Sequence, residues 1–193
     1  MPRPDVSAER KPQILQAAMQ VVSRKGYVSA RMDEIAREAG LSVGILYWYY
    51  KGKLEIALAL MELLLPLDDS LMQTLLASPE PCRARLWRLF SDGAGDENVL
   101  LWAELYHLAA REPRVSKVLE KYIAQYQSIS VQLIEQGIAR GELRSTIDPQ
   151  SAALTLQAMF DGYMTYLVLK PKLPNLGESL KQSFDLLFDG LKA

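Results

Sequence analysis

The chain has 193 residues, of which 49% are hydrophobic and 23% are charged, so it has enough apolar material to bury a sizeable core. Its single cysteine, Cys82, excludes an intrachain disulfide and a metal site built from clustered cysteines. No apolar run is long enough to span a bilayer, and the N-terminal segment lacks the apolar stretch of a secretion signal. These features predict a cytoplasmic protein that does not enter membranes.

The formal net charge of −1 is unevenly distributed along the chain. Residues 1–53 carry nine Lys and Arg against five Asp and Glu, whereas residues 54–193 carry thirteen against eighteen. A basic N-terminal segment followed by an acidic remainder indicates an anionic partner at that end only. A chance scatter of a few charges would give the same pattern, so this feature alone does not decide the function.

Helical periodicity runs through nearly the whole chain and no alternating strand pattern persists, which predicts an all-α fold of about nine helices. Gly26 should end the first helix, Pro66 should kink or stop the fourth, and Ser78 with Pro79 should start the fifth. The predicted helices cover residues 7–25, 32–39, 43–50, 54 to beyond 64, 78–90, 96–113, 114–140, 148–169 and 176–191.

The second and third predicted helices are short and are separated only by the segment "GLS" at 40–42. A small residue in such a turn lets two helices cross steeply, and apolar residues on both sides then fix the angle. Here Ile35 and Ala39 would face Leu46 across Gly40. The pattern predicts either a helix-turn-helix that offers its second helix to a DNA major groove or an ordinary helical corner.

Residues 14–60 resemble the DNA-binding domain of the tetracycline-repressor (TetR) family. The resemblance is carried by an apolar first helix ending in "GY" (26–27), by "MDEIAREAGLS" (32–42), and by the aromatic and lysine pattern of "GILYWYYKGK" (44–53). It implies a helix-turn-helix DNA-binding domain over residues 1–53. The remainder, residues 54–193, matches only in architecture and would be the helical ligand-binding and dimerisation domain.

The resemblance also implies which residues face DNA. Apolar side chains can pack on thymine methyl groups, while tyrosine hydroxyls and lysines can contact phosphates. Leu46 and Tyr50 are expected to be buried, and Trp48 either contacts DNA or packs partly. The implied DNA-binding residues are Arg31, Ser42, Val43, Gly44, Ile45, Tyr47, Trp48, Tyr49, Lys51 and Lys53.

One position departs from the family pattern, which usually has Thr or Ser just before the second helix. The chain has Ala30 and Arg31 there, with Ser29 displaced. Arg31 could replace the phosphate contact by its charge, and the helix cap would be weaker or come from Ser29.

The helix predicted from Asp148 is apolar on nearly every side, which predicts that a second copy of the chain helps to cover it. With the last helix it would form a homodimer interface, as in the family. A two-fold dimer would present two DNA-binding domains to the halves of a pseudo-palindromic operator.

The resemblance implies a pocket for a small-molecule effector in the C-terminal part, but no motif marks it, and core packing is the commoner role for each candidate taken singly. Aromatic walls would suit a small hydrophobic or aromatic compound. The candidate lining residues are Trp102, Leu105, Tyr106, His107, Tyr122, Gln125, Tyr126, Phe160 and Tyr163.

The sequence therefore predicts a transcriptional repressor that binds a double-stranded DNA operator and is released by its effector. Two other classes stay open: a TetR-like protein that acts through a protein partner, and a helical enzyme of small hydrophobic substrates. No Gly-rich phosphate loop, metal-ligand cluster or nucleophile–base pair supports the enzyme, so we predict no catalytic residue, no metal and no cofactor.

Overall fold

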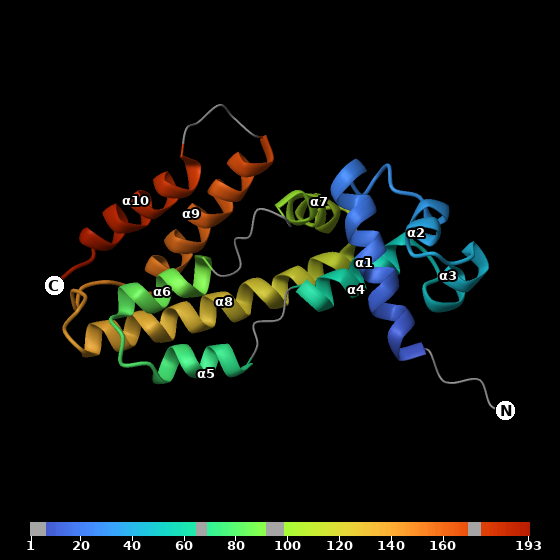
Figure 1. The fold of residues 1–193 in the computed structure, drawn as a ribbon. Helices are drawn as coiled ribbons and strands as arrows, with labels where there is room; N and C mark the ends of the chain where they lie inside the picture. Colours follow the sequence, from blue (N-terminus) through green and yellow to red (C-terminus); the bar gives the residue numbers. More distant parts are fainter. Residues whose placement is uncertain (1–6, 65–68, 92–98, 170–174) are drawn as a thin grey trace. The chain divides into compact units, whose positions relative to one another are not determined.

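The computed structural model describes residues 7–64, 69–91, 99–169 and 175–193 (Figure 1). Apart from an isolated bridge between Leu143 and Lys192, these residues form helices and turns only. Among the helices described, none is long and apolar enough to cross a membrane. The helices are α1 (Ser7–Lys25), α2 (Met32–Glu38), α3 (Val43–Tyr49), α4 (Lys53–Leu64), α5 (Asp69–Ala77), α6 (Cys82–Ser91), α7 (Val99–Ala109), α8 (Pro113–Ala139), α9 (Pro149–Leu169) and α10 (Leu176–Asp189).

The all-α prediction is confirmed, with ten helices in the described ranges instead of about nine. The additional helix is α5, which the sequence analysis had not separated from the segment around Pro66; residues 65–68 themselves lie outside the described ranges. The predicted start at Ser78 was wrong. Helix α6 begins at Cys82, because the Pro81 carbonyl accepts its first helical hydrogen bonds while the Ser78 hydroxyl accepts from the Glu80 N–H within the preceding turn.

The chain divides into two compact units. Unit 1 comprises residues 1–66 and 100–119, and unit 2 comprises residues 67–99 and 120–193. Helix α8 contributes its first residues to unit 1 and the rest to unit 2. The predicted functional division at residue 53 remains a prediction, because compactness alone does not test it.

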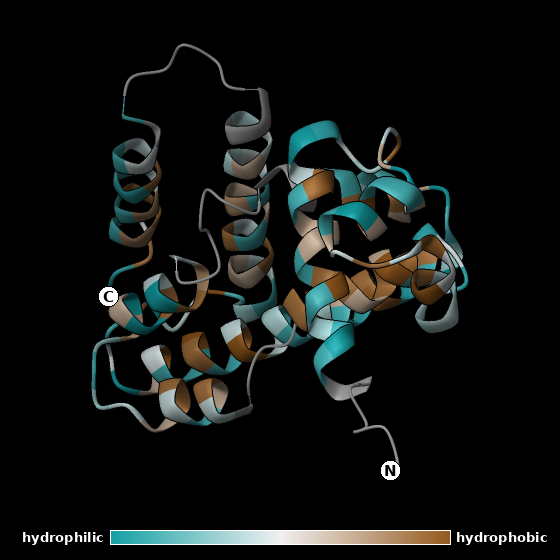
Figure 2. Ribbon diagram, turned by 45° about the vertical axis from the view of Figure 1, so that its right-hand side comes forward, coloured by the Kyte–Doolittle hydropathy of each residue, from teal (hydrophilic) through white to brown (hydrophobic). Residues whose placement is uncertain are grey.

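Within unit 1, helices α1, α2, α3 and α4 pack around one apolar core. Figure 2 shows hydrophobic and hydrophilic bands alternating along the helices, as expected for amphipathic segments. Ile14 and Ala18 of α1 are fully buried, as are Ile35 of α2 and Leu46 of α3. Gly26 ends α1 in a left-handed conformation with φ of 79°, as predicted.

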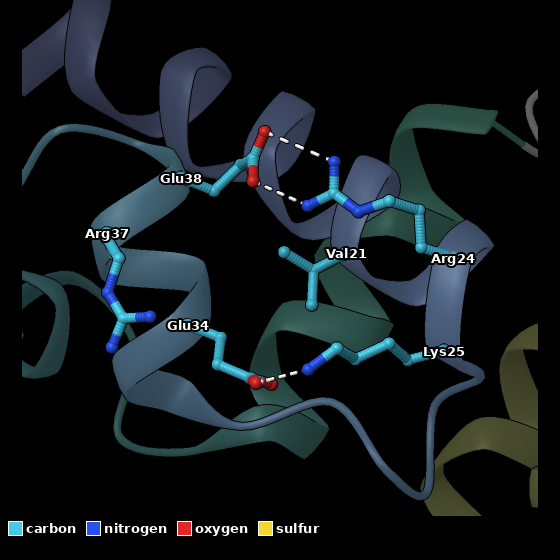
Figure 3. Close-up of a pocket in the computed structure, with 6 residues that line it drawn as sticks. All are labelled: Val21, Arg24, Lys25, Glu34, Arg37 and Glu38. Atoms are coloured by element: carbon cyan, nitrogen blue, oxygen red, sulfur yellow. Dashed lines mark hydrogen bonds and ion pairs between the residues drawn. The ribbon is translucent and has the colours of Figure 1, made fainter.

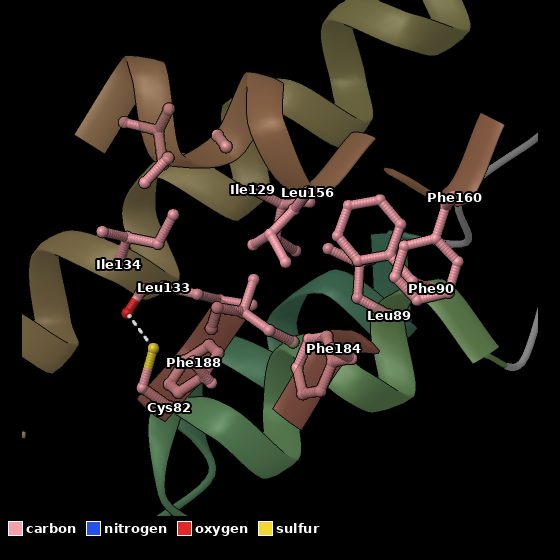
Figure 4. Close-up of a cluster of buried hydrophobic side chains, with 14 of the residues drawn as sticks. Cys82, Leu89, Phe90, Ile129, Leu133, Ile134, Leu156, Phe160, Phe184 and Phe188 are labelled. Atoms are coloured by element: carbon pink, nitrogen blue, oxygen red, sulfur yellow. Dashed lines mark hydrogen bonds between the residues drawn. The ribbon is translucent and has the colours of Figure 1, made fainter. Parts of the chain in front are cut away.

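Unit 2 is held together by a cluster of aromatic and aliphatic side chains from α5, α6, α8, α9 and α10 (Figure 4). Phe90 and Phe160 stack with their ring centroids 4.5 Å apart, and the buried Phe184 ring lies 5.2 Å from Trp87. Cys82 is buried in the same cluster, where its thiol donates to the Leu133 carbonyl at 3.2 Å. Burial raises the pKa of this thiol to about 12, so it is neutral and unreactive at physiological pH.

A charged side chain, Arg85, also lies fully buried in unit 2. Its guanidinium donates to the Leu75 carbonyl at 3.3 Å and to the Gln136 side chain at 2.5 Å, so it ties α5 and α8 to α6. Burial lowers the pKa of this group. The burial of Arg85 could not be predicted from the residues around it, because its hydrogen-bond partners lie ten and fifty-one residues away.

Helices α9 and α10 pack side by side within unit 2 (Figure 1), and both leave large apolar side chains exposed. On α9, Leu154 is 56% exposed and Tyr166 is 49% exposed, and on α10 Leu186 is 75% exposed. The apolar pattern of α9 predicted that a single chain would not cover this helix on every side, and the exposed Leu154 and Tyr166 agree with that prediction.

Candidate DNA-binding interface

The turn between α2 and α3 is built as a tight corner. Gly40 adopts a left-handed conformation with φ of 65°, and the Leu41 N–H donates to the Ala36 carbonyl at 2.8 Å. The Ser42 hydroxyl accepts from the Ile45 N–H at 3.3 Å, which caps the start of α3. The corner fixes the direction in which α3 leaves the turn, and so which of its side chains face solvent.

Helix α3 divides cleanly into an inner and an outer side. Leu46 is fully buried and Tyr50 is buried just after the helix, both as predicted. The outer side carries Ser42, Val43, Gly44, Ile45, Tyr47 and Trp48, all of them exposed, with Tyr49 half-exposed beside them. Every α3 residue predicted to face DNA therefore lies at least partly open to solvent.

Trp48, for which packing and DNA contact were both open, is 69% exposed. Its ring meets the Tyr49 ring edge-to-face with centroids 4.7 Å apart, and this contact restricts the indole. An indole this exposed keeps much apolar surface in contact with water, and covering that surface with a partner would be favourable. The exposure of Trp48 therefore favours a DNA contact over packing within the protein.

Two basic residues of the predicted interface lie outside α3, Lys51 after it and Arg31 before α2. Lys51 is exposed, and in the part of the chain that the structure describes its ammonium makes no ion pair. Arg31 stands just before α2, where its Nε lies 3.2 Å from a carboxylate oxygen of Asp33 in an exposed ion pair. The Arg31 N–H is capped by the Glu34 carboxylate at 3.2 Å, so Ser29 is not the cap. An arginine side chain has no acceptor, so only this half of a capping box exists.

Lys53 lies differently from the other predicted phosphate contacts. Its ammonium donates to three carbonyls of the turn between α1 and α2, those of Tyr27 at 2.6 Å, Val28 at 2.9 Å and Ala30 at 2.9 Å. It also lies 4.6 Å from the centroid of the Tyr27 ring. These bonds use all three N–H donors of the ammonium within the protein itself. This role could not be predicted from the residues around Lys53, because its partners are 23 to 26 residues away.

The same turn is contacted by α7, which belongs to unit 1 through residues 100–119. Gly26 has a φ of 79°, which residues with a side chain rarely adopt, and a Cβ atom there would lie 2.7 Å from a carboxylate oxygen of Glu104. Glu104 also acts on Lys53 electrostatically: burial lowers the pKa of Lys53, and the Glu104 carboxylate opposes that shift. Gly26, Lys53 and Glu104 thus form one cluster behind the helix-turn-helix.

We expect Lys53→Met to loosen the turn at residues 27–30. The substitution keeps an apolar stem but removes three charge-assisted hydrogen bonds, which corresponds to a loss of about 1–3 kcal/mol. Hydrogen exchange of a peptide spanning residues 26–31 should become faster. Lys51→Met, two residues earlier and exposed, is the matched control and should leave exchange unchanged; equal exchange in the two variants would contradict the assignment.

A hollow of about 370 Å³ opens between α1 and α2, lined by Val21, Arg24, Lys25, Glu34, Arg37 and Glu38 (Figure 3). Two ion pairs cross it: Arg24 to Glu38 at 2.5 Å, and Lys25 to Glu34. Each pair lowers the pKa of its glutamate through the hydrogen bond from the cation. Because its charges are largely paired between the two helices, we interpret this hollow as part of the packing contact between α1 and α2 and not as a binding site.

The predicted effector-binding residues are distributed over both units. Leu105, Tyr106 and His107 belong to unit 1, where Leu105 is buried and the other two are exposed. The Trp102 side chain lies outside the described part of the structure. Tyr122, Gln125, Tyr126, Phe160 and Tyr163 all belong to unit 2.

In unit 2 the aromatic candidates are partly brought together. The Tyr126 ring lies 4.5 Å from Tyr122 and 6.0 Å from Phe90, which stacks on the buried Phe160. The Tyr163 hydroxyl is hydrogen-bonded to Ser183 of α10 at 2.7 Å. Phe160 is therefore a core residue, whereas Tyr122, Gln125, Tyr126 and Tyr163 are only half-buried.

An all-helical chain whose basic N-terminal segment exposes the second helix of a helix-turn-helix has the features of a DNA-binding transcriptional regulator. Comparison with known families agrees. Residues 14–60 match the bacterial regulatory proteins of the tetR family, and residues 80–187 match the C-terminal domain of BetI-type transcriptional repressors. The chain belongs to the TetR family of transcriptional regulators, as its N-terminal resemblance predicted.

Individual relatives extend the similarity over nearly the whole chain. The fatty acid metabolism regulator protein of Bacillus subtilis is 23% identical, with 93% of this chain and 94% of the relative covered. The HTH-type transcriptional regulator TtgR of Pseudomonas putida is 25% identical, with 95% and 92% covered. A transcriptional regulator of Saccharomonospora viridis, solved in complex with choline, shares the fold with a TM-score of 0.81 at 21% identity, covering 94% of this chain and 96% of that one.

Proposed function

We propose that the protein is a dimeric repressor that binds a pseudo-palindromic operator in the cytoplasm and is released from it by a small hydrophobic or aromatic effector. The observation that carries the DNA-binding part is the division of α3, with Leu46 buried and Val43, Ile45, Tyr47 and Trp48 exposed. A helix that packs by one side and exposes large apolar and aromatic side chains on the other is typical of a surface that binds a partner.

The proposed DNA contacts fall into two groups. Val43, Gly44, Ile45 and Trp48 face the bases, and Ser42, Tyr47, Tyr49, Lys51 and Arg31 face the phosphates and sugars. Lys53 supports the interface from behind through the Tyr27–Ala30 turn. Hydroxyl groups together with Lys51 after α3 and Arg31 before α2 suffice for phosphate contacts in the absence of a basic residue within α3 itself.

The proposed dimer uses the exposed apolar side chains of α9 and α10. Leu154, Tyr166 and Leu186 are large apolar side chains, and about half or more of each is exposed, so covering them in a dimer would gain roughly 1–2 kcal/mol each. A two-fold arrangement through these helices would give the protein two DNA-binding domains for two operator half-sites.

The proposed effector site lies in unit 2, beside the half-buried Tyr122, Gln125, Tyr126 and Tyr163. Aromatic rings with a few polar groups suit a flat or greasy molecule of modest size. The effector would lower operator affinity only by as much as it prefers the protein's DNA-free conformation.

The test of DNA binding starts from duplexes selected by the wild-type protein from a random pool. Lys51→Ala should weaken binding and lower the slope of log K against log salt by about 0.9, the contribution of one phosphate contact. Tyr47→Phe should cost about tenfold if its hydroxyl donates to a phosphate. Lys117→Ala, an exposed lysine of α8, is the control and should change neither quantity. Failure to enrich any sequence, or equal effects of Lys51→Ala and Lys117→Ala, would count against this function.

A further inference from the structure

The outer side of α3 has an unusual chemical content for a helix that recognises bases. From Ser42 to Tyr50 there is no guanidinium, ammonium, carboxamide or carboxylate group. These are the groups that make bidentate hydrogen bonds to guanine, adenine or cytosine edges in the major groove. What α3 offers to the bases is apolar surface, hydroxyl groups and the single indole N–H of Trp48.

The apolar groups are arranged in an ordered way on that side. Gly44 and Trp48 lie one helical turn apart, opposite to the buried Leu46, with Val43 on one flank and Ile45 on the other. A Cβ atom at Gly44 would meet nothing within 4 Å, so the surface beside the Trp48 ring is open. The Trp48 ring itself packs edge-to-face on the Tyr49 ring, with centroids 4.7 Å apart, and leaves the turn at Gly44 uncovered.

The major groove contains one apolar group, the C5-methyl of thymine. We propose that this protein recognises its operator mainly through thymine methyl groups, which Val43, Ile45 and Trp48 contact on the floor of the groove. The proposal rests on the proposed function, because it assumes that α3 enters DNA. It adds which chemical groups of the operator determine recognition: the protein recognises methyl groups in each half-site in place of a pattern of hydrogen-bond donors and acceptors.

The size of the effect follows from the area buried. Removing one methyl group from an apolar contact lowers affinity by about fourfold, the equivalent of one buried CH₂. Two or three contacted methyls in each of two half-sites would multiply to a large loss. Lys51 and Arg31 would supply affinity for any duplex without choosing among sequences.

The experiment uses the duplex enriched by the wild-type protein and changes the DNA without changing the protein. Each thymine is replaced singly by deoxyuridine, which removes only the methyl group. At the sensitive positions, the T·A pair is replaced by C·G and then by 5-methylcytosine·G, which restores a methyl group in nearly the same place. We expect about fourfold loss per contacted thymine with deoxyuridine, and partial recovery with 5-methylcytosine relative to cytosine.

Protein variants then identify which side chain contacts which methyl. In Ile45→Ala or Trp48→Ala, the deoxyuridine penalty should disappear at one position and persist at the others. Lys51→Ala should weaken binding to every duplex while leaving each thymine-to-deoxyuridine ratio unchanged. Circular dichroism checks that the variants, all at exposed positions, remain folded.

The outcomes separate this proposal from the function on which it rests. Enrichment of a sequence followed by equal binding of all deoxyuridine duplexes would overturn methyl recognition and leave DNA binding intact. A deoxyuridine penalty that persists in every side-chain variant would also overturn it, because the effect would then come from DNA shape. If no sequence is enriched at all, the proposed function itself fails.

Discussion

The double substitution Leu154→Asp and Leu186→Asp should make the protein monomeric and lower its affinity for a two-half-site duplex by about a hundredfold or more. Leu154 on α9 and Leu186 on α10 are among the most exposed large apolar side chains of the chain. A carboxylate at either position would be desolvated in a dimer contact, at a cost that apolar packing cannot offset. Losing the dimer removes the second DNA-binding domain, and with it an effective-concentration gain of roughly 10²–10⁴.

Sedimentation and binding to duplexes with one and with two half-sites measure the two consequences separately. Binding to a single half-site should change little, because unit 1 is untouched. Ser128→Asp, an exposed position on α8, adds a carboxylate away from the proposed contact and should leave the protein dimeric. A double variant that stays dimeric, or a wild-type protein that sediments as a monomer and still occupies two half-sites, would contradict the proposed assembly.

Phe184→Ala should lower the free energy of unfolding by about 3–5 kcal/mol, the usual cost of removing a buried aromatic ring. Phe184 is fully buried, and its ring contacts those of Trp87, Phe160 and Phe188 at centroid distances of 5.2, 6.5 and 5.3 Å (Figure 4). The cavity would lie where α6, α9 and α10 meet, so these helices would lose their common contact.

Chemical denaturation followed by tryptophan fluorescence measures this loss, because Trp87 lies beside the substituted ring. Gln182→Ala, an exposed position on the same helix, is the control and should change stability by no more than about 0.5 kcal/mol. A loss below about 1 kcal/mol for Phe184→Ala would mean that the aromatic cluster does not hold unit 2 together.

The fold and the outline of the DNA-binding interface could be predicted because local sequence determines them. Helical spacing together with the family resemblance placed Leu46 inward and Tyr47 outward, and Gly26 marked the end of α1. The capping serine of α3 could be recognised in the same way. Each of these features depends on residues within one or two turns.

The features that the sequence did not reveal depend on residues far apart in the chain. Nothing near Lys53 indicates that its ammonium bonds to the turn at Tyr27, and nothing near Arg85 indicates that it is buried. The exposure of Trp48 depends on how α3 packs as a whole. The effector site stays a proposal for the same reason, because aromatic residues line cores and pockets alike.

The central claim, that α3 lies against DNA, is tested most directly by cleavage of the selected duplex from an iron chelate attached beside this helix. Gly52→Cys places the attachment just after α3, where a Cβ atom meets nothing within 4 Å. The natural Cys82 is buried with a pKa of about 12, so it will not react with the label. We predict localised cleavage within each half-site from residue 52 and none from Gln182→Cys on α10. Cleavage from residue 182 alone, or cleavage scattered along the duplex from residue 52, would contradict the account.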